Sequence, residues 1–256
     1  MPAWSCKATG GYSSSSTEGQ NNGINIATLL LNSGFALRPA AAVLGSSVGE
    51  GGLNPWRWES DQVPTMAQFN VWSQGNAKWS HGYGLFGFTP ANRYINSTSF
   101  NNWQQYGYGA NFSDRPGSVL DGQAQVMFFL SEFDSAWNNY NLDHGANYRQ
   151  KFATIGIDAS VFMQYSASQF KADIPSLSLT DLTAAFTCCY EKPANPQNSY
   201  YARGQAAAYW YSVLSGSPIT PTPPSPDPDP TPDMPFGAEF PFWLLAKVSS
   251  KWRWLN

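Results

Sequence analysis

A proline-rich segment near the C-terminus limits what this chain can fold into. Between Pro218 and Pro235 there are nine prolines, with three aspartates among them. Proline has a fixed φ and no backbone N–H, so such a run cannot form a helix interior or a central strand. The composition favours an extended polyproline II spacer. We therefore expect residues 217–235 to be a linker.

The rest of the chain divides into three parts around this linker. Residues 21–216 have helical apolar patterns and enough length for one folded domain. Residues 1–20 are rich in serine, glycine and threonine, which predicts a flexible N-terminal arm. Residues 236–256 are aromatic and basic and form a C-terminal segment. The N-terminus has no apolar signal region and the chain has no run of 18 apolar residues, so we expect delivery by a route other than standard secretion.

Composition excludes some functions and leaves others open. Charged residues make up 12% of the chain and the net charge is −3, which argues against nucleic-acid binding through a basic face. The three cysteines and two histidines have no metal-ligand spacing, so we expect neither metal nor cofactor. Aromatic residues reach 16%, which suits either a surface that stacks on sugars or a large aromatic core.

Apolar periodicity predicts a mostly helical domain. Residues 54–112 lack a helical period and are expected to be loops with a short β-hairpin near residues 83–89. Together these patterns predict an α+β fold. The expected helices cover residues 24–31, 37–50, 118–140, 158–170, 181–190 and 199–214.

The helix expected over residues 37–50 ends in a carboxylate, Glu50, directly before Gly51 and Gly52. The negative end of the helix dipole and burial among apolar side chains would favour the protonated form of this carboxyl group. Glycosidases use a protonated carboxylic acid to protonate the leaving oxygen. The alternative is a solvated glutamate before a glycine turn.

A second informative stretch is H-G-Y-G-L-F-G-F-T-P, residues 81–90. Small and aromatic residues alternate there, as in a hairpin whose backbone is open to a ligand. The alternative is an ordinary core hairpin.

Several motifs occur in a fixed order along residues 21–216. The chain carries G-x-x-x-x-E-x-x-x-N-P at 45–55, G-Y-G-L-x-x-F-T-P at 82–90, P-A-N-R-Y-I at 90–95, Y-E-K-P-A-N-P at 190–196 and R-G-Q-A at 203–206. This series resembles the phage tail lysozyme family, in particular the lysozyme domain of tail-tip peptidoglycan hydrolases of short-tailed phages of Gram-positive bacteria. Gly51, Ser46 and Gly87 depart from the residues that are frequent in the family at those places.

The resemblance implies a lysozyme-like fold with a small β-hairpin lobe and a cleft. It implies cleavage of the β-1,4 bond between N-acetylmuramic acid and N-acetylglucosamine, with Glu50 as the catalytic acid. Asp61 is our choice for a second carboxylate, and the alternative is that Asp61 and Glu59 are both solvated loop carboxylates. Glu191 is interpreted as structural and as a partner of Arg203. The expected substrate-binding residues are Trp58, Tyr83, Gly84, Leu85, Phe88, Thr89 and Tyr94.

The function expected from these observations is a muramidase carried in the phage tail that opens peptidoglycan for genome delivery. Its expected partners are peptidoglycan and, through residues 236–256, phage tail proteins, with membrane contact as an alternative for that segment. Other readings are a lytic transglycosylase, an endolysin or a glycan-binding tail component without activity. A thiol hydrolase using Cys6, Cys188 or Cys189 is the rival from another reaction class.

Overall fold

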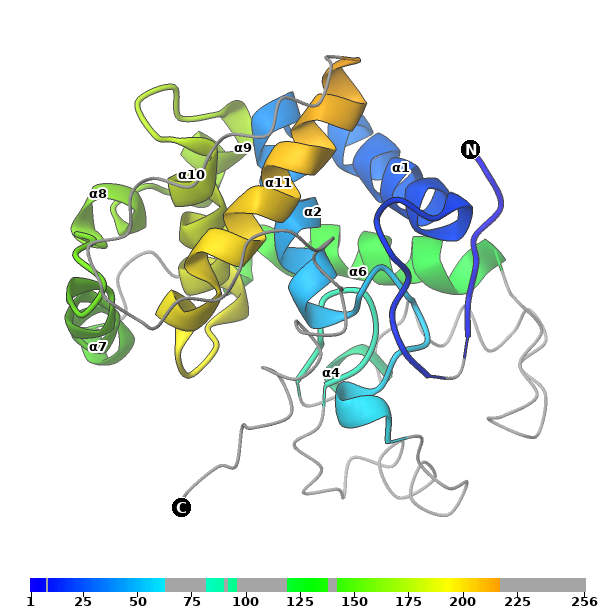
Figure 1. Cartoon of the computed structure of the whole chain (residues 1–256), viewed down its shortest axis with the longest axis horizontal. Coiled ribbons are helices and arrows are strands. Elements are labelled where there is room, and N and C mark those ends of the chain that lie inside the picture. The colour runs from blue at the N-terminus through cyan, green and yellow to red at the C-terminus, as the bar shows by residue number, and fades with distance from the viewer. Residues whose placement is uncertain (8, 63–81, 90–91, 96–118, 138–141, 217–256) are drawn as a thin grey trace, which may run out of the picture.

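The computed structural model describes residues 1–7, 9–62, 82–89, 92–95, 119–137 and 142–216 (Figure 1). The predicted linker, 217–235, and the predicted C-terminal segment, 236–256, lie outside these residues. The helices are α1 (Thr17–Asn32), α2 (Leu37–Glu50), α4 (Asn92–Ile95), α6 (Val119–Ala136), α7 (Leu142–Ala153), α8 (Ser160–Met163), α9 (Ala167–Ala172), α10 (Leu179–Phe186) and α11 (Tyr200–Ser215), with 3-10 turns at Glu59–Asp61 and Pro196–Ser199 and a π turn at Thr187–Glu191.

Helix α2 is the central element of the domain. It packs against α11, α10 and α1, as Figure 1 shows. Every residue from Pro39 to Ser47 is buried, which is typical of a core helix rather than a surface helix. A Cβ at Gly45 would lie only 2.6 Å from backbone atoms of Arg203 and Ala207. The missing side chain of Gly45 therefore brings α2 and α11 into direct backbone contact.

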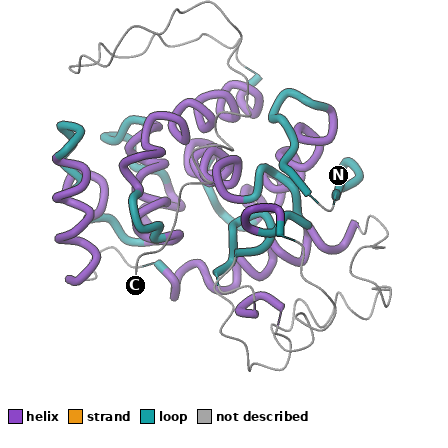
Figure 2. The backbone as a smooth tube through the Cα atoms, turned by 60° about the horizontal axis from the view of Figure 1, so that its bottom comes forward, coloured by secondary structure: helices purple, strands orange, loops and turns teal. Residues whose placement is uncertain are grey.

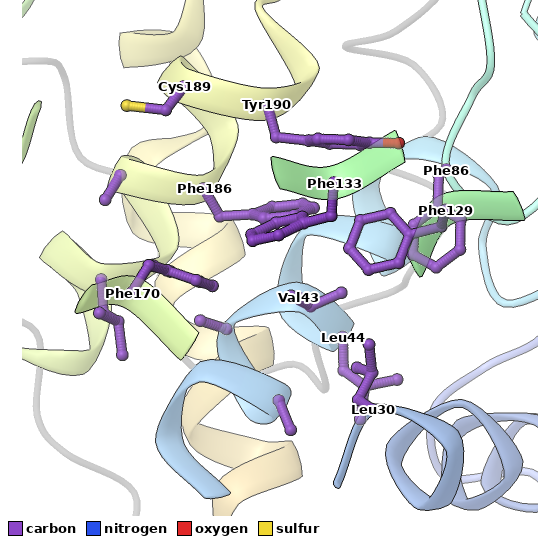
Figure 3. Packing of buried hydrophobic residues seen from close by; sticks show 14 of the residues in the cluster. Leu30, Val43, Leu44, Phe86, Phe129, Phe133, Phe170, Phe186, Cys189 and Tyr190 are labelled. Atoms are coloured by element: carbon purple, nitrogen blue, oxygen red, sulfur yellow. The ribbon is translucent and has the colours of Figure 1, made fainter. Parts of the chain in front are cut away.

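An aromatic core lies beside α2. The ring of Phe186 stacks on Tyr190 with centroids 5.2 Å apart, and Phe133 lies close by in Figure 3. Phe86, from the Gly82–Thr89 turn, stacks on Phe129 of α6 at 4.5 Å. The core therefore extends from the helices to this turn, and much of the aromatic content of the chain is used in packing.

The N-terminal residues, expected to be a flexible arm, pack on the domain in the structure. Trp4 is 5% exposed, and α1 begins at Thr17 after the N-cap Ser16, inside the predicted arm. The side chain of Asn22 bonds both backbone polar groups of Ser5. One buried indole and a few side-chain amides are sufficient to order a segment whose composition is polar.

The mostly helical character expected from the sequence is confirmed, with local differences. The helix expected over 158–170 is two short helices, α8 and α9, and the one expected over 181–190 ends in the π turn. Helix α7 was not expected. The residues near 83–89 form bridged pairs, Trp58–Tyr83 and Tyr83–Phe88, and no strand occurs among the described residues (Figure 2).

The described part of the chain has neither a membrane-spanning helix nor a cluster of metal-ligand side chains. None of its helices combines the length and apolar character that a membrane span requires. Within the same residues, no three His, Cys, Asp or Glu side chains are grouped as metal ligands would be.

Candidate active site

Glu50 is the last residue of α2, and its side chain is 26% exposed. Oε1 accepts a hydrogen bond from Nη2 of Arg203 on α11. Because α2 and α11 touch at Gly45, the two side chains meet although they are distant in the sequence. Glu50 is thus a partly exposed carboxyl group that is bound on its protein side by the guanidinium group of Arg203.

Arg203 is largely buried and holds more than one partner. Its Nη1 donates to Oε2 of Glu191 at 2.5 Å and also to Oγ of Ser46, and its Nε donates to Oγ of Ser199 at 2.9 Å. Ser46 in turn donates to Glu191 at 2.8 Å. The expected pairing of Glu191 with Arg203 is confirmed, and the same guanidinium also binds the candidate acid.

The electrostatics of this cluster follow from its burial. The side chain of Glu191 is 4% exposed; desolvation, and then the charge of Glu50, raise its pKa from 4.5 to about 8. Burial opposes the charge of Arg203, but Glu50 and Glu191 outweigh it, so the pKa of Arg203 is raised. One permanent cation therefore faces two carboxyl groups, of which the buried one binds a proton near neutral pH.

The Gly82–Thr89 turn lies directly over the end of α2. Tyr83 and Phe88 close it with two backbone hydrogen bonds of 3.2 and 2.9 Å. A methyl group at Gly51 would overlap the backbone of Gly84, and a Cβ at Gly87 would lie 2.8 Å from Oε2 of Glu50. Gly51 and Gly87 are thus the positions where the turn and the end of α2 come closest to each other.

The predicted substrate-binding residues form one compact group around this turn. The Trp58 and Tyr83 rings lie 4.4 Å apart, and the Tyr94 ring stacks on Phe88 at 5.3 Å. Most of the group is buried: Trp58, Tyr83, Gly84, Leu85, Phe88 and Tyr94 are buried, and Thr89 is exposed. The rings pack on each other and hold the turn, so its outer surface is formed by backbone and Thr89.

Asp61 and Glu59, the two candidates for a second carboxylate, each bind different partners in the structure. Asp61 is 39% exposed, accepts from the backbone N–H of Gly10 at 2.7 Å and pairs with Arg57 at 3.3 Å. Glu59 accepts from the backbone N–H of Gly82 at 2.8 Å. Ser60 and Asp61 both have positive φ, of 58° and 56°, which strains non-glycine residues.

Sequence reasoning missed several buried polar residues that support the site. Gln125 of α6 accepts from the N–H of Leu85 and donates to the carbonyl of Pro55, so it joins the segment that follows α2 to the Gly82–Thr89 turn. Asn54 bonds the backbone of Lys7 and Gly10. A glutamine among the apolar residues of the 118–140 pattern was the available signal for Gln125.

The cysteines have little of the character of a nucleophile. Burial raises the pKa of Cys188 well above its ordinary value and that of Cys189 to about 12. Both therefore stay as inert thiols near neutral pH. Cys6 is partly exposed in the N-terminal segment.

Comparison with known proteins shows the family to which most of the chain is similar. The Phage tail lysozyme family profile matches residues 21–214. The chain is also 26% identical over 196 residues to "Morphogenesis protein 1" of Bacillus phage B103, an alignment that covers 76% of this chain and 40% of that protein. It therefore spans about two fifths of the length of that relative. Because this family profile matches most of the length of the chain, the chain belongs to the phage tail lysozyme family.

Proposed function

We propose that this protein is a peptidoglycan muramidase and that Glu50 is its general acid. The observation that carries the proposal is the placement of Glu50: a partly exposed carboxyl group at a helix end, bound by Arg203 and covered on one side by the Gly82–Thr89 turn. The bond cleaved is the β-1,4 linkage between N-acetylmuramic acid and N-acetylglucosamine. Glu50 protonates the leaving oxygen, and the carboxylate left behind is stabilised by Arg203.

Asp61 is proposed as the second carboxylate. Its support is the strained backbone of Ser60 and Asp61, since strain of this kind gathers at functional sites. A distance of about 5–5.5 Å between the two carboxyl groups would predict hydrolysis with retention of the configuration at the sugar carbon. A distance of about 6.5–9.5 Å would predict inversion. Asp61→Asn keeps an acceptor for Gly10 N–H, so lost activity in a folded variant supports the role. Glu59→Gln is the matched control.

The substrate-binding surface is proposed to be the turn around Tyr83, Gly84, Leu85, Phe88 and Thr89, supported from beneath by Trp58 and Tyr94. Its backbone and the Thr89 hydroxyl supply polar groups for sugar hydroxyls and acetamido groups. Together with Glu50, this hairpin-like lobe forms one wall of the proposed cleft.

We place the enzyme in the phage tail, where it opens the host cell wall during genome delivery. The family and the morphogenesis protein of a Bacillus phage support a tail location. Residues 217–235 are proposed as the spacer and 236–256 as the segment that binds a tail protein. No cofactor enters the proposal.

The product distinguishes the proposed hydrolase from a lytic transglycosylase. Mass spectrometry of peptidoglycan digested by the full chain is expected to show reducing muramic acid ends. Ends in the 1,6-anhydro form would identify a transglycosylase instead. No cleavage, with glycan binding intact, would identify a non-catalytic tail component.

A further inference from the structure

The buried carboxyl group of Glu191 has no role in the reaction described so far. It lies on the π turn Thr187–Glu191, a form of helix that is frequent at functional sites. Oε2 accepts from Arg203 and Ser46, whereas Oε1 is buried without a hydrogen-bond partner among the described residues. A fully ionised carboxylate is costly in such a place.

Arg203 connects this group to the candidate acid. One guanidinium nitrogen binds Glu191 and another binds Glu50, so two carboxyl groups share a single positive charge. With both carboxyl groups ionised, the cluster carries one net negative charge in a largely buried place. One added proton makes the cluster neutral, and like charges at this range favour its uptake.

We propose, on the basis of the muramidase function above, that Glu191 is a positioning residue that shares one proton with Glu50 through Arg203. When the proton is on Glu191, Glu50 is a carboxylate paired with Arg203. When it is on Glu50, Arg203 pairs with ionised Glu191 and the catalytic acid is ready. The two carboxyl groups around one guanidinium group thereby hold one proton between them more readily than a single arginine-bound carboxyl group would.

Four elements of the described part of the chain contribute groups that face this cluster. From α2 come Glu50 and Ser46, from α11 comes Arg203, and from the 3-10 turn comes Ser199, which accepts from Nε of Arg203. The π turn adds Cys188 and Tyr190 beside Glu191; burial raises the pKa of both well above the ordinary value, so both stay neutral near pH 7. Thr187 bonds Ser46 at 3.2 Å and carries no charge.

Two substitutions are expected to move the pH profile in opposite directions. Glu191→Gln keeps the shape and an acceptor but removes the second charge, so the alkaline limb of activity on purified peptidoglycan moves to lower pH by about one unit or more. Ser46→Ala removes a donor that stabilises ionised Glu191, so the limb moves to higher pH. Displaced packing alone would not produce shifts of opposite sign.

Asp173→Asn is the matched control. It removes another carboxylate paired with an arginine, Arg38 at 3.1 Å, at the far end of α2, and is expected to leave the profile in place. An alkaline limb of the pH profile that stays in place in Glu191→Gln would overturn the proposal. If that variant does not fold, Ser46→Ala decides the question alone: a limb that stays, or moves to lower pH, would overturn it.

A second readout does not depend on activity. Carboxyl 13C shifts of glutamate-labelled full-length protein are expected to show Glu50 and Glu191 titrating together, with one proton retained near pH 7. In Glu191→Gln, the Glu50 signal is expected to titrate at lower pH. Two carboxyl groups that both ionise below about pH 5 would overturn proton sharing. Retained activity in Glu50→Gln would instead remove the muramidase assignment of Glu50 and leave this titration result unaffected.

Discussion

Arg203 donates a hydrogen bond from its guanidinium group to the carboxyl group of Glu50, which lies 153 residues earlier in the chain. The contact joins the end of α2 to the first turns of α11. It exists because Gly45 allows the two helices to touch. The candidate acid is therefore held by the core of the domain.

Loss of Arg203 is expected to destabilise the fold strongly. Arg203→Ala removes a buried guanidinium group that binds Ser46, Ser199 and two carboxyl groups, and breaking such a buried network by removing one partner typically costs about 3–5 kcal/mol. Urea denaturation followed by circular dichroism measures the free energy of unfolding. Arg38→Ala is the control, because its pair with Asp173 is about one fifth exposed and is expected to contribute less. Equal losses of unfolding free energy in Arg203→Ala and Arg38→Ala would contradict the burial assigned to the cluster around Arg203.

The stability of the protein is expected to depend on the protonation of Glu191. Its pKa is raised from 4.5 to about 8 by burial, so the folded state binds this proton more tightly than the unfolded state. The resulting stability is fully present below about pH 4.5 and is lost as pH rises through about 8. Thermal unfolding between pH 5 and 9 tests this. The difference between wild type and Glu191→Gln isolates the residue, and parallel curves would show that Glu191 does not titrate there.

Trp4 is expected to anchor the N-terminal segment to the domain. Its side chain is 5% exposed and packs on Gly122 of α6. Trp4→Ala is expected to cost about 3–5 kcal/mol, as for other buried tryptophans, and to lower the melting temperature. Met127→Ala, at a residue of α6 that is 48% exposed, is the control and is expected to leave the melting temperature nearly unchanged. A melting temperature unaffected by Trp4→Ala would support the flexible arm expected from composition.

Truncation after Gly216 tests the proposed tether. Helix α11 ends at Ser215, so the truncated chain keeps all the described helices. We expect full activity on purified peptidoglycan and loss of the protein from assembled particles. Reduced activity would instead indicate that residues 217–256 dock on the domain, and normal incorporation into particles would rule out the tether.

The local pattern of the sequence predicts the ends of α2 correctly, because Pro39 in its first turn and the glycine pair after Glu50 are local signals. The same pattern cannot predict that Arg203 binds Glu50, since that depends on two helices that touch far apart in the chain. The packing of residues 1–16 was missed for a similar reason. Their anchors are one tryptophan and the side chains of Asn22 and Asn54, which polar composition conceals. The aromatic content left core and sugar-binding roles open, and burial shows that Tyr83 and Phe88 belong to the core.

The most direct test of the central claim is the activity of Glu50→Gln on purified peptidoglycan. The isosteric amide keeps an acceptor for Arg203, so the circular dichroism spectrum and melting temperature are expected to remain close to wild type. Without the acid, the cleavage rate is expected to fall by about 10²–10⁴-fold. A folded Glu50→Gln variant that keeps more than about half of the wild-type rate would contradict the assignment, since loss of a positioned general acid costs far more.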